Sequence, residues 1–125
     1  MSIPKILPPK GILISVDQFK KIEYNQEKKT LDVGSGVTWR EVYDYFEKAT
    51  SGQGLGVVGG DPLVGVSGWL LGGGYSLLTN KYGLGMDNIV GFQVHVPPGR
   101  GEHRDVRILN ANRQENPDLF KALKV

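Results

Sequence analysis

The sequence predicts an α+β fold in which a mostly antiparallel sheet of about five strands is flanked by two or three helices. Three observations support this fold class. A chain of 125 residues has room for one domain with a modest core. Several short segments alternate apolar and polar residues between turn-forming residues, which indicates antiparallel hairpins. Two segments, residues 38–49 and 116–125, begin with helix-capping residues and continue with apolar side chains at helical spacing.

The first strands are expected near the amino terminus. Residues 1–10 contain three prolines and should form an extended N-terminal segment, and residues 12–16 are rich in β-branched side chains and should form a short strand. Apolar and polar residues then alternate in 22–24 and in 31–33, on either side of the polar turn 26–29. This pattern predicts a β-hairpin with one buried face.

The helix that follows has a clear start signal. Thr38 and Glu41 have the spacing of a capping box, with Thr38 as N-cap, and Val37 and Val42 are placed to form a hydrophobic staple. The apolar stripe of this helix comprises Trp39, Val42, Tyr43, Phe46 and Ala49. Ser51–Gly52 is expected to end the helix.

The segments beyond this helix are shorter. Val57 and Val58 are expected to form a brief buried strand. Residues 64–71 are apolar and predict a short helix, which three glycines at 72–74 would end. Residues 79–85 are expected to form a polar loop that contains glycine.

The last third of the chain predicts a hairpin and a helix. Residues 90–96 alternate as in a half-buried strand, with His95 on the solvent side, and Val106 and Ile108 indicate a returning strand. Asn116–Pro117 opens a helix with an N-cap and a proline at its first position. Its buried face comprises Leu119, Phe120 and Leu123.

Composition excludes several classes of function. The sequence has no cysteine, so disulfides, thiol nucleophiles and thiolate metal sites are excluded. Its two histidines, His95 and His103, would need carboxylates to complete a metal site. The net charge is only +2 and the charges are mixed in sign, so no nucleic-acid partner is expected. No stretch approaches the ~20 apolar residues of a membrane span, and the compartment is left open.

The glycines indicate where a functional site should lie. Twelve of the 18 glycines fall between Gly52 and Gly85. Residues 54–59 match a dinucleotide-binding fingerprint, but they follow a predicted helix and lead into a strand, so a loop is the better interpretation. Gly65 and Gly68 would leave backbone N–H groups exposed to an anionic ligand such as a pyrophosphate. The alternative is tight helix–sheet packing without any ligand, and the residues alone leave both interpretations open.

Four motifs resemble one family, in the order that the family has them. They are residues 34–39 (GSGVTW), 64–68 (VGVSG) with 71–75 (LGGGY), 82–90 (YGLGMDNIV), and 116–123 (NPDLFKAL). Together they resemble FAD-linked oxidases of the berberine-bridge-enzyme-like branch of the vanillyl-alcohol-oxidase-type (PCMH-type) FAD-binding domain. A generic nucleotide-binding module would explain the glycine loop but none of the other motifs.

The resemblance implies a fold and an activity. Residues 11–125 would be a partial FAD-binding domain, its second α+β half, with the upstream flavin loop, the substrate domain and the catalytic base outside this chain. FAD would take a hydride from a small organic substrate and be reoxidised by oxygen. The resemblance assigns these residues to the cofactor: Asp61, Gly65, Val66, Ser67, Gly68, Trp69, Gly74 and Tyr75.

Two positions depart from the family pattern. Relatives that hold FAD by two covalent bonds have a cysteine where Asp61 stands, so a cysteinyl link is not possible here. Many relatives have a histidine where Trp69 stands. Tryptophan at this position lacks the polar contact that the histidine makes with the flavin.

Two functions therefore remain open. The chain would contribute half of an FAD site to a flavoenzyme, or it would be a non-catalytic remnant acting as a small structural or interaction protein. With half a site, we expect weak or no FAD binding, and no catalysis, by this chain alone. Sheet edges and apolar faces left uncovered favour self-association, so a homo-oligomer is expected.

Overall fold

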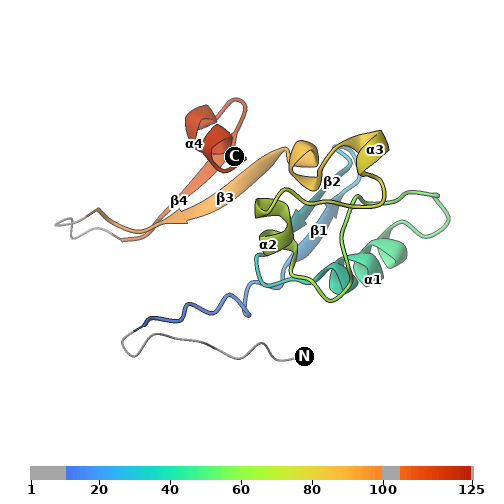
Figure 1. Cartoon of the computed structure of the whole chain (residues 1–125), viewed down its shortest axis with the longest axis horizontal. Helices are drawn as coiled ribbons and strands as arrows, with labels where there is room; N and C mark the ends of the chain where they lie inside the picture. The colour runs from blue at the N-terminus through green and yellow to red at the C-terminus, as the bar shows by residue number, and fades with distance from the viewer. Residues whose placement is uncertain (1–10, 100–104, 125) are drawn as a thin grey trace.

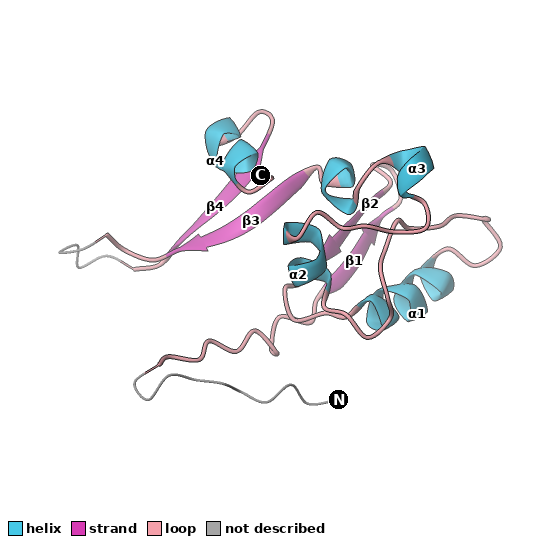
Figure 2. Ribbon diagram, viewed as in Figure 1, coloured by secondary structure: helices cyan, strands magenta, loops and turns pink. Residues whose placement is uncertain are grey.

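The computed structural model describes residues 11–99 and 105–124, whose elements form two small units (Figure 1). The strands are β1 (Ile22–Asn25), β2 (Thr30–Val33), β3 (Gly91–Val96) and β4 (Arg107–Asn112). The helices are α1 (Trp39–Ala49), α2 (Val66–Leu71), α3 (Thr79–Tyr82) and α4 (Pro117–Ala122), with a 3-10 helix η1 (Gly85–Asn88). The predicted α+β class and antiparallel pairing are confirmed. The single sheet of about five strands is wrong, because the strands of the described residues form two separate two-stranded sheets, β1–β2 and β3–β4 (Figure 2).

The first unit has its core between the β1–β2 hairpin, α1 and α2. The predicted hairpin is confirmed, and its register places Ile22 opposite Val33 and Tyr24 opposite Leu31. The residues buried in its central cluster are Val37, Trp39, Val42 and Val66. Burying one such apolar side chain stabilises a fold by about 1.5–3 kcal/mol. This cluster therefore fixes α2, and with it the glycine-rich segment, against the hairpin and α1.

The predicted start of α1 is confirmed. The Glu41 carboxylate accepts hydrogen bonds from the Thr38 backbone N–H at 2.7 Å and from the Thr38 hydroxyl at 2.9 Å. It also accepts hydrogen bonds from the Lys20 ammonium group, whose Nζ lies 2.9 Å from each carboxylate oxygen. The Thr38 backbone N–H, then Lys20, then the Thr38 hydroxyl lower the pKa of Glu41 to about 2. A single carboxylate thus ties the segment before β1 to the first turn of α1.

The second unit consists of β3, β4 and α4. The predicted hairpin is confirmed, and Phe92 of β3 contacts Phe120 of α4 with ring centroids 5.9 Å apart. Ala111, which pairs with Phe92 across the hairpin, is fully buried. His95 is solvent-exposed as predicted, although its ring meets the edge of Phe19 at 5.8 Å between centroids. The second unit therefore has its own small apolar cluster.

Three predicted elements differ in the structure. Residues 12–16 form no strand, and Ile12 and Ile14 are 89% and 82% exposed, because none of the strands in the described part of the chain lies beside them. Residues 57–58 are half-buried but irregular for the same reason. The expected polar loop at 79–85 contains the short helix α3 and the start of η1. The extended segment predicted for residues 1–10, and His103, lie outside the described residues.

Candidate functional site

Most glycines of the 52–85 segment have a structural reason to be glycine. A Cβ on any of four of them would overlap an aromatic ring or the backbone packed against it: Gly59, Gly60, Gly74 and Gly85. Five have positive φ, a conformation that side chains disfavour: Gly52, Gly54, Gly73, Gly74 and Gly83. Tight packing, the alternative raised from the sequence, therefore explains much of the glycine content.

Trp69 is the side chain that three of these glycines, Gly60, Gly74 and Gly85, surround. Its indole meets the Trp39 ring edge to face, with centroids 5.0 Å apart and planes at 82°. Its Nε1–H donates to the Tyr75 carbonyl at 3.1 Å, and Cβ atoms on Gly60 or Gly85 would occupy the space of its ring. Trp69 thus joins three stretches of the glycine-rich segment and holds the scaffold of the site together.

Gly65 and Gly68 have no such internal reason. Gly65 has φ −69° and Gly68 lies within α2, so neither needs left-handed backbone. Beyond adjacent residues and the helix's own backbone, a Cβ on either glycine would have no atom of the described chain within 4 Å. These two positions are open toward the outside of the molecule. Glycine there keeps the backbone accessible to something that is not part of the described residues.

The backbone N–H groups around these glycines divide into two sets. Val66 N–H donates to the Val37 carbonyl at 2.9 Å, and Trp69 N–H donates to the Gly65 carbonyl at 3.1 Å. Within residues 11–99 and 105–124, the N–H groups of Gly65, Ser67 and Gly68 have no acceptor. Three neighbouring donors without acceptors fit the oxygens of an anionic group. This observation supports a phosphate-bearing cofactor at the predicted position.

The position of this backbone is fixed by α1. Thr38, the N-cap of α1, forms an isolated antiparallel bridge with Gly65, and Trp39 N–H donates to the Val64 carbonyl at 3.0 Å. The Ser67 hydroxyl donates to the Ser35 carbonyl at 3.3 Å. The exposed donors are therefore held by a rigid element rather than by a free loop.

The other predicted site residues have diverse surroundings. Val66 is only 3% exposed, so its side chain belongs to the core. Gly74 is buried against Trp69 and Tyr75 is 72% exposed, and both lie beside the Trp69 indole. The exposed Asp61 carboxylate accepts the Leu63 N–H at 2.8 Å, at the turn before α2.

Sequence reasoning missed a contribution of Tyr43. Its hydroxyl donates to the Gly60 carbonyl at 2.6 Å, which ties the glycine segment to α1. Burial, and secondarily the Asp61 carboxylate, raises the pKa of Tyr43, so the phenol keeps its proton and remains a donor. The helical spacing of Tyr43 assigned it to the core, and spacing alone gave no sign of this hydrogen bond.

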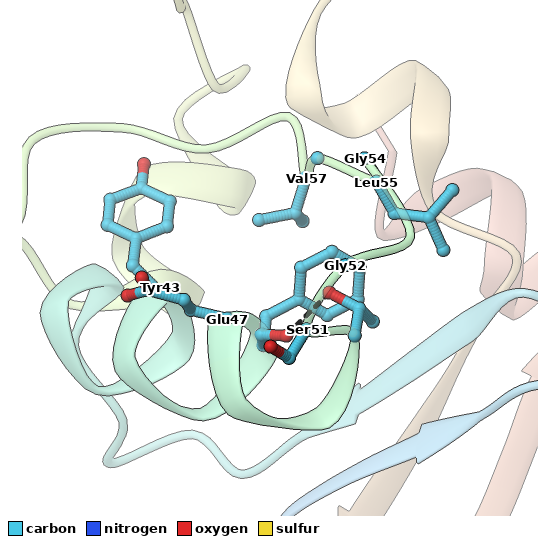
Figure 3. A pocket seen from close by; sticks show the side chains of 10 residues that line it. Tyr43, Glu47, Ser51, Gly52, Gly54, Leu55 and Val57 are labelled. Carbon is cyan, nitrogen blue, oxygen red and sulfur yellow. Dashed lines mark hydrogen bonds between the residues drawn. The ribbon is translucent and has the colours of Figure 1, made fainter.

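The described residues contain no other feature that identifies a site of known type. No group of three or more His, Asp or Glu side chains in this part of the chain could hold a metal ion. No helix among the described residues is long and apolar enough to cross a membrane. A groove of about 520 Å³ lies between α1 and residues 51–57 (Figure 3). Gly65, Ser67 and Gly68 do not line it.

Comparisons with known proteins identify the family of this chain. A family model described as "FAD binding domain" matches residues 4–105. An FAD-dependent monooxygenase, yanF, of Aspergillus niger is 40% identical over 115 residues, which cover 91% of this chain and 18% of that protein. An uncharacterized FAD-linked oxidoreductase of Arthroderma benhamiae is 37% identical over 115 residues, 91% of this chain and 21% of the relative.

A solved structure supports the same relationship. A variant of BBE-like 1 from Physcomitrella patens matches with a TM-score of 0.72 and 32% identity, over 86% of this chain and 21% of that one. The chain thus spans about a fifth of the length of the relatives it matches.

Proposed function

This chain belongs to the FAD-binding-domain family, in its berberine-bridge-enzyme-like branch, and on that premise we propose that its exposed amides bind the diphosphate of FAD. The observation that supports this proposal most is the group of acceptor-free donors at Gly65, Ser67 and Gly68. Three N–H groups on one rigid turn suit two linked phosphates, which offer several oxygens within a small volume. Glycine at 65 and 68 leaves space for the diphosphate to approach the backbone amides closely.

The neighbouring residues would place the rest of the cofactor. Gly74 and Tyr75 lie beside the Trp69 indole, which presents a rigid aromatic and glycine surface near the exposed amides. Asp61, held by its bond to the Leu63 N–H, would line the same side of the site. A carboxylate at 61 cannot form the thioether link that a cysteine would provide, so this position contributes only non-covalent contacts.

We infer that the whole protein is an FAD-dependent oxidoreductase that acts on a small organic substrate. Bound FAD would supply the oxidant, taking a hydride from the substrate and passing the electrons on to oxygen. This chain's part is to bind and orient the cofactor, and its described residues include no group with the surroundings of a catalytic base. We therefore expect weak FAD binding and no turnover by the chain alone.

Gly68→Ala provides the test of the proposed site. Alanine at this helical position has room within the chain and should stabilise the fold by about 0.5–1 kcal/mol. The same methyl group would obstruct the approach of the diphosphate. FAD at millimolar concentration should raise the melting temperature of the wild-type chain, and this increase should be lost in Gly68→Ala.

A matched variant separates binding from stability. Asn80→Ala places alanine in the exposed α3 helix, outside the proposed site, and should retain the full FAD-dependent increase. The proposal is wrong if the FAD-dependent increase is absent in the wild type or survives unchanged in Gly68→Ala.

A second candidate function is a non-catalytic interaction protein. The observation in its favour is the large number of exposed apolar side chains, among them Ile12, Ile14 and Leu77, the last 99% exposed. Such a protein would be colourless, its melting temperature would not change with FAD, and it would self-associate. The same FAD titration therefore distinguishes the two candidates.

A further inference from the structure

The groove beside α1 is a second concave surface, separate from the proposed FAD site. It has a volume of about 520 Å³ and lies between the last two turns of α1 and the loop 51–57. Figure 3 shows Tyr43 and Glu47 on the helix side, with Leu55 and Val57 on the loop side. The exposed amides near Gly65 adjoin the opposite end of α1, which is about 16 Å long at ~1.5 Å per residue.

The lining of this groove carries a negative charge. Glu47 is the only charged residue among those that line it. Within the described ranges 11–99 and 105–124, the ion pairs are Lys20–Glu41 and Lys21–Glu23, so Glu47 has no cationic partner there. The groove is also at the carboxyl end of an 11-residue helix, where the helix dipole is negative. Both contributions favour a cation.

The helix carbonyls add to this preference. The Phe46 carbonyl accepts both the Thr50 N–H at 2.9 Å and the Thr50 hydroxyl at 2.7 Å. The carbonyls of Glu47, Lys48 and Ala49 have no donor among the described residues, and of these three residues Glu47 lines the groove. Acceptors without donors at a helix end are satisfied by water or by a ligand that donates hydrogen bonds. An ammonium group donates three and accepts none.

The remaining lining is apolar or aromatic. Phe46, Leu55 and Val57 contribute apolar side chains, and Tyr43 adds a second ring. A pocket of this volume is within the range of small-molecule sites, about 300–1,000 Å³. Aromatic faces also attract cations directly. The lining thus suits a molecule with one positive charge and an apolar body.

We propose that the groove between α1 and residues 51–57 binds a small organic ammonium ion with an apolar or aromatic body. The ammonium group interacts with the Glu47 carboxylate and with the Glu47 carbonyl at the end of α1. The apolar body lies against Leu55, Val57 and the Phe46 ring. This site is independent of FAD and uses none of the residues assigned to the cofactor.

Phenethylamine and its neutral analogue phenethyl alcohol are suitable probes, since they differ mainly in charge. Titration of the ¹⁵N-labelled chain should shift the amide signals of residues 47–57 with phenethylamine. The amine should bind about fivefold more tightly than the alcohol, which is the difference expected when one cation binds at a partly exposed site. Glu47→Gln should reduce this preference, because only the contribution of the helix end remains, and should leave the rest of the spectrum unchanged.

Glu27→Gln is the matched control, because it removes the same charge from the exposed turn of the first hairpin. It should bind phenethylamine as the wild type does. Equal binding of amine and alcohol, or equal loss of binding in both variants, would overturn the proposal. So would an absence of shifts in residues 47–57 while the spectrum shows a folded chain.

Discussion

At the scale of single residues, Glu41 shows how one side chain connects sequence and structure. Its spacing from Thr38 was sufficient to predict a capping box, because the pattern is local. The salt bridge with Lys20 spans 21 residues and could not be predicted from any local pattern. In the folded state, the Glu41 carboxylate is therefore stabilised by Lys20 as well as by the capping box.

This binding predicts a dependence of stability on pH. The pKa of Glu41 is about 2 in the folded chain and near 4.5 without these partners. The carboxylate's contribution is therefore fully present above about pH 4.5 and is lost as the pH falls from there through 2. Urea unfolding of the wild type between pH 6 and 2.5, measured in steps of ~0.5 pH unit, should show this loss in the free energy of unfolding. In Glu41→Gln, the free energy of unfolding should depend less steeply on pH over the same range.

Glu27→Gln serves as the control for the pH experiment, because Glu27 lies on an exposed turn. It should reproduce the wild-type slope. Identical pH profiles for the wild type and Glu41→Gln would contradict the role given to this carboxylate.

Residue-scale reasoning located the cofactor donors only in part. Gly65 and Gly68 were predicted from the sequence and are open in the structure. Val66 was predicted with them, but its N–H is used by the Val37 carbonyl, 29 residues away. The role of Trp69 as the centre of a glycine-lined packing cluster depends on Gly60, Gly74 and Gly85 converging from separate stretches. Such convergence is a tertiary property that a linear pattern does not contain.

At the scale of elements, the sequence predicts those whose partners are close in the chain. The two strands of each hairpin are consecutive in the chain, and their alternating patterns predicted the correct pairs. Residues 12–16 have the composition of a strand but no neighbouring strand among the described residues. Because strand formation depends on backbone hydrogen bonds to a partner, composition alone gave the wrong result there.

The β3–β4 hairpin should depend on α4 for its stability. An isolated two-stranded hairpin is marginally stable in water, and Phe120, 6% exposed, is the main apolar contact that α4 offers it. Phe120→Ala should cost this unit about 3 kcal/mol. Amide hydrogen exchange should then show lost protection in β3 and β4, with protection in α1 retained.

Lys121→Ala changes an exposed residue of the same helix and should leave the exchange of β3 and β4 unaltered. If Phe120→Ala reduces protection equally in α1 and β3, the two units unfold together and the prediction is wrong.

At the scale of the whole molecule, the exposed apolar surface is the dominant feature. Ile12, Ile14 and Leu63 are 89%, 82% and 78% exposed, and the chain spans about a fifth of the length of its relatives. Apolar surface of this kind favours association, because burying it removes it from water.

We therefore predict that the chain self-associates in solution. Sedimentation velocity should give a weight-average mass that rises with concentration above the monomer mass of 13.7 kDa. Ile12→Lys combined with Ile14→Lys should reduce this association without affecting the core of the first unit. An ideal monomer across the concentration range would contradict the prediction.

The central claim is that backbone amides at Gly65, Ser67 and Gly68 bind the diphosphate of FAD. Amide chemical shifts of the ¹⁵N-labelled chain, followed during parallel titrations with FAD and with riboflavin, test it most directly. Riboflavin shares the ring system but has no phosphate. The account predicts that FAD shifts the signals of these three amides most and that riboflavin does not shift them. Unchanged signals of these amides with FAD, or equal shifts with riboflavin, would contradict it.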